Sequence, residues 1–260
     1  MEPVVCRRAR PLLGTLVDVE AEGPGAQAAV AAAFEEIAAV HALLSFHAPD
    51  SELQLINRAA PGARLHVDQR TVTVLRLAAA LYDASARAFD CRVGTREQLA
   101  DTRFPVAFEG DMLIKQTGAS MDLGGIAKGY AVDRAIEVML AHAIERAVVN
   151  AGGDLRHCGV RPMTVQVRDP RNAAHVAKTM TLDNAALASS TAGGLGAHAG
   201  SASRIHGADR MPLPGLAGAT VQAPTCMLAD ALTKIVLGMG DAAQPLLDRY
   251  GATVALYSPI

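Results

Sequence analysis

The segment from Met121 to Tyr130 carries the residues that are best placed to do chemistry. It reads MDLGGIAKGY, so Gly124 and Gly125 separate the carboxylate of Asp122 from the start of a helix. Glycine lets the backbone approach a ligand closely, and a helix N-terminus favours an anion. Lys128 could then reach a phosphate, and Asp122 could accept a hydrogen bond from a ribose, an amide or a ring N–H. A plain helix entry with a solvated lysine would read the same way, and the residues leave both interpretations open.

Two further segments could also contact a ligand. Residues 150–154 (NAGGD) end a short apolar strand with two glycines, which is equally the pattern of a tight turn. Asp230 and Thr233 share one face of a helical segment. Oxygen atoms on that face could hold Mg²⁺, which takes one or two protein oxygens together with phosphates and water. An exposed helix face, or an ion pair between Asp230 and Lys234, would use the same residues without a metal.

The elements expected around these segments mix strands and helices without strict alternation. Alternating or continuous apolar residues predict strands at 12–20, 147–149, 164–168 and 253–256, and a hairpin at 106–115. Helical spacing of apolar residues predicts helices at 30–44, 71–86, 126–140 and 228–237. The segment 192–218 is expected to be a long irregular loop, and such loops are often functional. We therefore predict an α+β fold of mixed sheets packed with helices, in a single domain covering residues 1–260.

The composition excludes several classes of protein. The chain has 260 residues, of which 50% are hydrophobic and 3% aromatic, and its net charge is −2. Such a chain is not disordered, and it has no basic surface for nucleic acid. No transmembrane segment is expected, because Glu35, Glu36 and His41 interrupt the most apolar helix. With few aromatic rings to stack on, a site for a flat cofactor must depend on other groups.

The cysteines and the N-terminus bear on the cellular compartment. Cys6, Cys91, Cys158 and Cys226 are widely spaced, so neither a zinc site nor a disulfide framework is predicted. The first residues lack the apolar region of a signal peptide. A cytoplasmic location is therefore expected for the chain as given, although a periplasmic protein whose leader had been removed would read the same way.

Taken together, the three segments resemble the FAD:protein FMN transferases, the ApbE family, as they would appear in a divergent member. Residues 122–133 (DLGGIAKGYAVD) look like the most specific signature of the family, and 149–156 (VNAGGDLR) and 223–232 (APTCMLADAL) are similar to two others. Weaker matches lie at residues 13–15, 45–53 and 88–94. The matches follow the order of the family and cover nearly the whole chain. The resemblance therefore implies the α+β flavin-transferase fold of that family.

The resemblance also implies an activity. Family members bind FAD and Mg²⁺, move FMN onto a Ser or Thr of a target flavoprotein through a phosphodiester bond, and release AMP. Phosphoryl transfer depends mainly on positioning and on neutralising charge at the phosphates, which a metal ion and a lysine can supply. The expected ligands are therefore FAD and Mg²⁺, and the expected partner is a flavoprotein with an acceptor hydroxyl.

Matched residue by residue, the resemblance assigns roles to positions of this chain. Asp230, Thr233 and the backbone carbonyl of Gly125 would bind the metal, and His206 is the candidate base for the target hydroxyl. His47 lies where many members have an aromatic residue, and it could stack on a ring. The residues expected to bind FAD are Leu13, His47, Ala88, Phe89, Asp90, Asp122, Lys128 and Ile205.

Three departures from the family pattern keep other functions open. Members commonly have a Thr four residues after the metal Asp, where this chain has Lys234; a protonated lysine cannot ligate Mg²⁺, although its ammonium could supply part of the charge. Arg204 replaces the usual His, so His206 would have to substitute for it. Residues 188–194 match the family's Thr-Ser-Gly turn only loosely. The alternatives are a non-catalytic FAD-binding protein and an Mg²⁺-dependent hydrolase that splits FAD into AMP and FMN.

Overall fold

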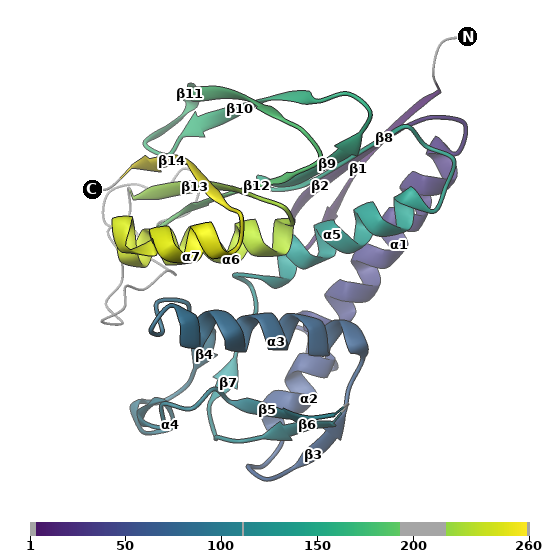
Figure 1. Cartoon of the computed structure of the whole chain (residues 1–260). Coiled ribbons are helices and arrows are strands. Elements are labelled where there is room, and N and C mark those ends of the chain that lie inside the picture. Colours follow the sequence, from purple (N-terminus) through teal and green to yellow (C-terminus); the bar gives the residue numbers. More distant parts are fainter. Residues whose placement is uncertain (1–3, 111, 193–216, 259–260) are drawn as a thin grey trace.

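A seven-stranded sheet forms the upper half of the molecule in Figure 1. This computed structural model describes residues 4–110, 112–192 and 217–258. The strand order is β1-β2-β8-β9-β12-β13-β14, and every neighbouring pair is antiparallel. The strands are β1 Val5–Leu12, β2 Thr15–Glu22, β8 Arg146–Ala151, β9 Asp154–Gly159, β12 Ala186–Thr191, β13 Gly218–Ala223 and β14 Thr253–Ser258.

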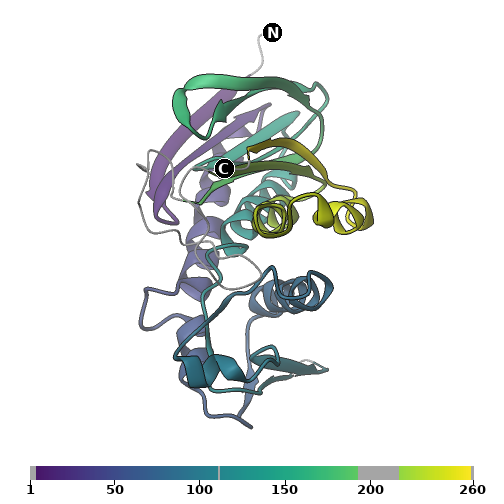
Figure 2. The same ribbon diagram turned by 90° about the vertical axis from the view of Figure 1, so that its left-hand side faces the viewer.

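Helices cover one face of this sheet, and a hairpin covers the other (Figures 1 and 2). Alternate residues of β8 divide between the two faces, because Val149 joins the buried cluster on the helical side and Val148 joins a smaller cluster beneath the hairpin. Burial on both faces explains why this short strand is continuously apolar. The helices are α1 Ala26–Leu44, α5 Ala127–Leu140 and α6 Cys226–Met239, and the hairpin is β10 Met163–Asp169 with β11 Asn172–Leu182.

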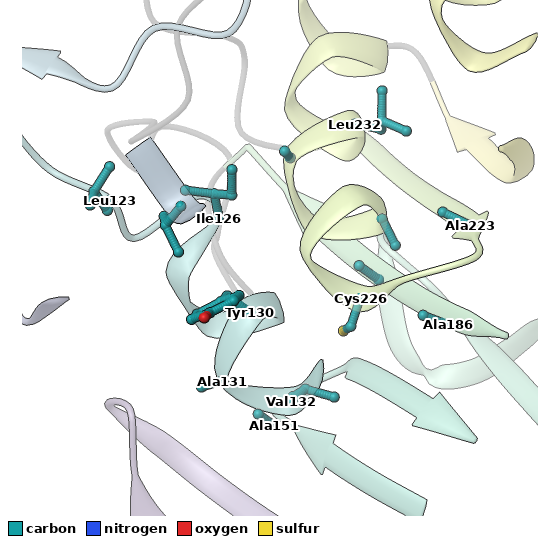
Figure 3. Close-up of a cluster of buried hydrophobic side chains, with 14 of the residues drawn as sticks. Leu123, Ile126, Tyr130, Ala131, Val132, Ala151, Ala186, Ala223, Cys226 and Leu232 are labelled. Atoms are coloured by element: carbon teal, nitrogen blue, oxygen red, sulfur yellow. The ribbon is translucent and has the colours of Figure 1, made fainter. Parts of the chain in front are cut away.

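Helices α5 and α6 pack directly against each other. They come closest at Gly129, where an added β carbon would lie 2.3 Å from the carbonyl oxygen of Cys226. Val132 of α5 and Cys226 of α6 belong to the same buried cluster (Figure 3). Asp133 of α5 ties the pair together, since its carboxylate accepts hydrogen bonds of 2.8 Å from the N–H groups of Cys226 and Met227 at the start of α6. A 3-10 helix, Gly240–Ala243, and α7, Gln244–Arg249, follow α6 and lead into β14.

The chain between α1 and α5 forms the lower half of the molecule (Figure 2). Its strands make a three-stranded sheet of order β3-β6-β5 and a pair β4-β7. Its three helices begin at residues that cap free backbone N–H groups: Ser51 accepts from Gln54, Asp68 from Arg70 and Thr95 from Gln98. The elements are α2 Glu52–Arg58, β3 Arg64–His66, α3 Gln69–Ala84, β4 Arg92–Val93, α4 Arg96–Ala100, β5 Val106–Glu109, β6 Met112–Lys115 and β7 Ser120–Met121.

Helix α1 is long and apolar enough, at 19 residues and a mean hydropathy of 1.3, to meet the criteria for a membrane span. Its buried side chains, which include Val30, Phe34 and Ile37, instead join the core cluster that also contains side chains of β2 and α5. The same length and composition are found in the core helices of globular folds. The packing therefore explains its apolar stripe without a membrane.

The structure confirms the predicted α+β fold and most of the predicted elements. Helices α1, α3, α5 and α6, the β5–β6 hairpin and strands β8, β10 and β14 lie close to their predicted positions. The strand predicted at 12–20 begins too early, because Leu13 and Gly14 form the turn between β1 and β2. The elements that were not predicted are strands β1, β3, β4, β7, β9, β11, β12 and β13 and helices α4 and α7. Most of the expected loop at 192–218, with Ile205 and His206, lies outside the described residues.

Candidate active site

Two cavities meet at the beginning of α5. The larger has a volume of about 1350 Å³ and the smaller about 800 Å³. Among the described residues, the side or main chains of Gly124, Lys128 and Lys234 line both cavities. The larger cavity exceeds the roughly 300–1,000 Å³ of sites for drug-sized ligands, so it has room for a dinucleotide. A group held at the junction can be reached from both sides.

The larger cavity lies between the two halves of the molecule. Its walls come from the β1–β2 turn, the end of α1, the loop between α3 and β4, the glycine turn before α5, and Lys234 of α6. These segments are far apart in the sequence, and the fold brings most of the predicted site residues to one cavity. The predicted residues that line it are Leu13, His47, Ala88, Phe89, Asp90, Asp122, Gly125 and Lys128.

The glycine turn is shaped by Asp122. Its Oδ1 accepts a hydrogen bond of 2.9 Å from the N–H of Gly124, and its own N–H donates to the carbonyl of Cys91 at 2.8 Å. The second bond joins the turn to the loop between α3 and β4, which forms another wall of the larger cavity. Asp122 therefore positions the turn that precedes α5, and so positions Lys128 in the first turn of that helix.

Lys128 is held beside two buried carboxylates. Its Nζ contacts Asp154 of β9, and it lies 3.9 Å from Oδ2 of Asp230. Asp154 and Asp230 are 1% and 0% exposed. Burial lowers the pKa of Lys128, and the charge of Asp230 opposes that shift. Sequence reasoning missed Asp154, although the residue ends the quoted NAGGD segment. A carboxylate directly after a glycine turn was the available signal.

Lys234 forms an ion pair with Asp230 one helical turn earlier. Its Nζ contacts Oδ1 of Asp230 and donates to the main-chain carbonyl of the same residue at 3.0 Å. The other carboxylate oxygen, Oδ2, accepts from the N–H of Gly129 at 3.1 Å. Burial alone would raise the pKa of Asp230, but the charges of Lys128 and Lys234 outweigh it and hold that pKa below its ordinary value. This is the ion-pair alternative that the spacing left open.

Thr233 points into the protein. Its hydroxyl donates to the carbonyl of Asp230 at 2.7 Å, and it lies 2.7 Å from the hydroxyl of Ser190 on β12. Because a hydroxyl has one proton, Ser190 is the donor in the second bond. Thr233 is 0% exposed, and it lines neither cavity. The hydroxyl joins α6 to the sheet.

Two of the three predicted metal ligands, Asp230 and Thr233, can be tested against these contacts. Mg²⁺ requires near-octahedral oxygen ligands at about 2.0–2.1 Å. The Lys234 ammonium contacts Oδ1 of Asp230, and the N–H of Gly129 donates to Oδ2. The Thr233 hydroxyl is hydrogen-bonded to Ser190. As placed, these residues do not fit Mg²⁺ unless Lys234 moves away.

The residues predicted to contact the flavin differ in how accessible they are. Phe89 is 4% exposed and packs mainly into the core. Asp90 is held by the guanidinium of Arg92 at 3.0 Å, so this carboxylate already has a cationic partner. His47 is exposed at the cavity wall, where its ring meets Phe46 edge-on with centroids 5.6 Å apart. Of these residues, His47 is the one best placed to stack on a ligand.

An arginine in the loop between α3 and β4 also lines the larger cavity, and sequence reasoning missed it. Arg87 is exposed and has a φ of 75°, and its neighbour Ala86 has a φ of 48°. Residues without the freedom of glycine rarely adopt this left-handed conformation, and it is often found at ligand sites. The position directly before the predicted Ala88–Asp90 stretch was the only signal in the sequence.

The fold is the one seen in solved ApbE structures. The chain superposes on the ApbE protein of Thermotoga maritima with a TM-score of 0.81 and 24% identity, covering 97% of this chain and 94% of that one. For the flavinyl transferase ApbE of Pseudomonas stutzeri, in its apo form, the TM-score is 0.82 at 20% identity, covering 97% and 90%.

The sequence agrees with the fold, and the chain belongs to the ApbE family, whose model matches residues 13–257. It is 27% identical over 187 residues to the FAD:protein FMN transferase of Treponema pallidum, covering 59% of this chain and 52% of that protein. It is 32% identical over 192 residues to the enzyme of the same name from Rhodobacter capsulatus, covering 61% and 36%. The alignments thus span about half and about a third of these relatives.

Proposed function

We propose that this protein transfers FMN from FAD to a Ser or Thr hydroxyl of a target flavoprotein and releases AMP. The observation that carries the proposal is the larger cavity, which gathers residues 13, 47, 88–90, 122, 125 and 128 around a space of about 1350 Å³. Family membership supports the same function, because curated relatives are FAD:protein FMN transferases.

The reaction is a substitution at the phosphorus of the FMN half of FAD. The hydroxyl oxygen of the target attacks this phosphorus, and the bond to the bridging oxygen of the pyrophosphate breaks. AMP leaves with that oxygen, the hydroxyl loses its proton to a base, and a phosphodiester joins FMN to the target. Such transfer depends on holding the phosphates and neutralising their charge. Lys128, at the junction of the two cavities, is placed for that role.

The second cavity favours a transferase over a simple FAD-binding protein. It opens on the other side of Lys128 and lies between the sheet and the β10–β11 hairpin. In a transferase, both FAD and the acceptor hydroxyl must reach the site, so that the hydroxyl can attack the phosphorus of the FMN half. With FAD in the larger cavity, an acceptor hydroxyl could approach through the smaller one. His206 stays the predicted base, and it lies outside the described residues.

Magnesium is the part of the expectation that the described residues support least. If the ion bound as the resemblance implies, Asp230, Thr233 and the Gly125 carbonyl would hold it, and it would supply positive charge at the phosphates. That dependence stays a prediction. The contacts of Lys234 with Asp230 oppose it.

The test is incubation of the purified chain with FAD, with and without Mg²⁺, and a flavin-acceptor domain. We expect AMP to be released and the acceptor to gain a covalent fluorescent flavin. Lys128→Ala should lose both products, whereas Lys178→Ala, which changes an exposed lysine on β11, should keep both. AMP and FMN without a labelled acceptor would instead show a hydrolase. Bound FAD that yields no AMP would show a non-catalytic binding protein.

A further inference from the structure

We infer that the Lys234 ammonium takes the place of a divalent cation beside the phosphates of FAD, so that FAD binding and turnover do not require Mg²⁺. The inference rests on the proposed function, because it concerns how the same site holds FAD. Three features of the structure support it: where the ammonium is held, what surrounds its aliphatic stem, and the charge balance of the cluster.

The ammonium is fixed by a single residue. Asp230 contacts Lys234 Nζ through its Oδ1 and accepts a hydrogen bond of 3.0 Å through its main-chain carbonyl. An ammonium has three N–H donors. These two contacts use two donors and leave one for a ligand. The Lys234 side chain is 19% exposed and lines both cavities, so the remaining donor can reach a phosphate oxygen at their junction.

The stem of Lys234 lies against the glycine turn. A β carbon added at Gly125 would lie 3.4 Å from Cε of Lys234 and 3.8 Å from its Cδ. The lysine chain therefore lies between α6 and the turn before α5, at the position where the resemblance implies a metal ion. An ion bound to the Gly125 carbonyl and to Asp230 would have to displace this side chain.

The charge balance of the buried cluster indicates what Lys234 contributes. Lys128 and Lys234 carry two positive charges, and Asp154 and Asp230 carry two negative charges, so the cluster is neutral. With a threonine at position 234 and no metal, the same cluster would have a net charge of −1 and would repel a pyrophosphate. Adding a divalent ion would reverse the sign. Lys234 therefore removes the need for that ion.

The experiment measures the dissociation constant of FAD by quenching of flavin fluorescence, first in EDTA and then in MgCl₂. For the wild-type chain we expect the same value in both buffers. For Lys234→Thr we expect binding in EDTA to weaken by about 10- to 100-fold, the range for losing a hydrogen bond to a charged group, and to recover in MgCl₂. Lys178→Thr is the matched control and should behave as wild type.

A second readout does not depend on any variant. Titration of MgCl₂ into the wild-type chain saturated with FAD should give no binding heat. Loss of FAD binding by the wild type in EDTA, or a stoichiometric Mg²⁺ signal, would overturn the inference, as would a folded Lys234→Thr variant that binds FAD normally in EDTA. Release of AMP in MgCl₂ but not in EDTA would also overturn the inference. If FAD binds in EDTA but neither AMP nor labelled acceptor forms in either buffer, the proposed function fails and the role of Lys234 in binding FAD stands.

Discussion

At the scale of single residues, the least expected member of the site is Asp154. Its buried carboxylate contacts the Lys128 ammonium across the gap between β9 and α5. Removing one partner of a buried ion pair leaves the other charge unpaired, which typically costs about 3–5 kcal/mol. Asp230 lies 3.9 Å from Lys128 and would compensate in part. We therefore expect Asp154→Asn to lower the free energy of unfolding by about 1–3 kcal/mol.

Urea unfolding followed by circular dichroism would measure this effect. Asp83→Asn, which changes an exposed carboxylate on α3, is the matched control and should leave the free energy of unfolding unchanged. An Asp154→Asn protein as stable as the control would show that the contact with Lys128 contributes nothing to folding.

Lys115 gives a test of buried charge away from the site. It is 1% exposed, its Nζ donates to the carbonyl of Ala119 at 2.7 Å, and burial lowers its pKa from 10.5. Between the lowered pKa and 10.5 the unfolded chain binds more protons than the folded one. The free energy of unfolding therefore rises as the pH rises through that window.

The variant Lys115→Met should lack this rise. The measurement is the difference in free energy of unfolding between wild type and variant from pH 7 upwards, in which the wild type should gain on the variant as the pH approaches 10.5. Lys178→Met, at an exposed lysine, is the matched control for replacing a lysine by methionine. Parallel profiles for wild type and Lys115→Met would contradict the prediction.

At the scale of elements, the site depends on how closely α5 approaches α6. A β carbon at Gly129 would lie 2.3 Å from the carbonyl oxygen of Cys226 and 2.9 Å from Cβ of Asp230. Alanine would gain about 1 kcal/mol of helix propensity. Overpacking against backbone costs about 1–3 kcal/mol or more, and the helices would have to separate. We expect Gly129→Ala to lower stability and to weaken FAD binding, because Lys128 and Asp230 move apart.

Thermal unfolding and FAD titration would check this prediction together. The control is Gly118→Ala, where the nearest atom to an added β carbon is Cγ of Gln98 at 4.0 Å. That variant should match the wild type in both measurements. Normal FAD binding by Gly129→Ala would mean that the spacing of α5 and α6 does not set the site.

The elements also show what the sequence could reveal. Helix α1 was predictable because its stripe through Val30, Phe34 and Ile37 repeats at helical spacing and is buried by one continuous surface. Strands β12 (ALASST) and β13 (GATVQA) were not, because their residues are mostly small and their burial does not alternate along the strand. No local alternation marks such strands.

The same distinction holds for the site. The turn from Asp122 to Lys128 was predictable, since its residues are adjacent in the sequence. Its glycines and its lysine suit an anionic ligand, and its carboxylate can accept a hydrogen bond. The pairing of Lys128 with Asp154 was not, because it depends on how β9 and α5 pack. For Asp230 and Lys234, the spacing left the ion pair and the metal site as alternatives. The structure favours the ion pair, because Asp230 is fully buried beside the ammonium groups of Lys128 and Lys234.

At the scale of the whole molecule, FAD in the larger cavity should bind the two halves of the fold together. A ligand at about 100 times its dissociation constant stabilises the folded state by about 2.7 kcal/mol. Hydrogen exchange should slow at residues 87–94 of the lower half and in the segment 122–128 beside α5, because both segments line this cavity. The three-stranded sheet β3-β6-β5 does not line it and should exchange unchanged.

Mass spectrometry of exchanged peptides, with and without FAD, would measure this pattern. Protection confined to the β10–β11 hairpin and to residues 150–155 would place FAD in the smaller cavity instead. That result would contradict the assignment of the two substrates to the two cavities.

A cation carried on a side chain changes what the site responds to. A metal ion exchanges with solvent, so its site fills only when enough free ion is present, and similar ions compete for it. Lys234 is made with the chain, and one ammonium is present per molecule whatever the supply of ions. Chelation, magnesium starvation or excess Ca²⁺ would leave it in place. Acetylation of the Lys234 amine would remove its positive charge. FAD binding at such a site would therefore depend on lysine modification rather than on the supply of metal ions.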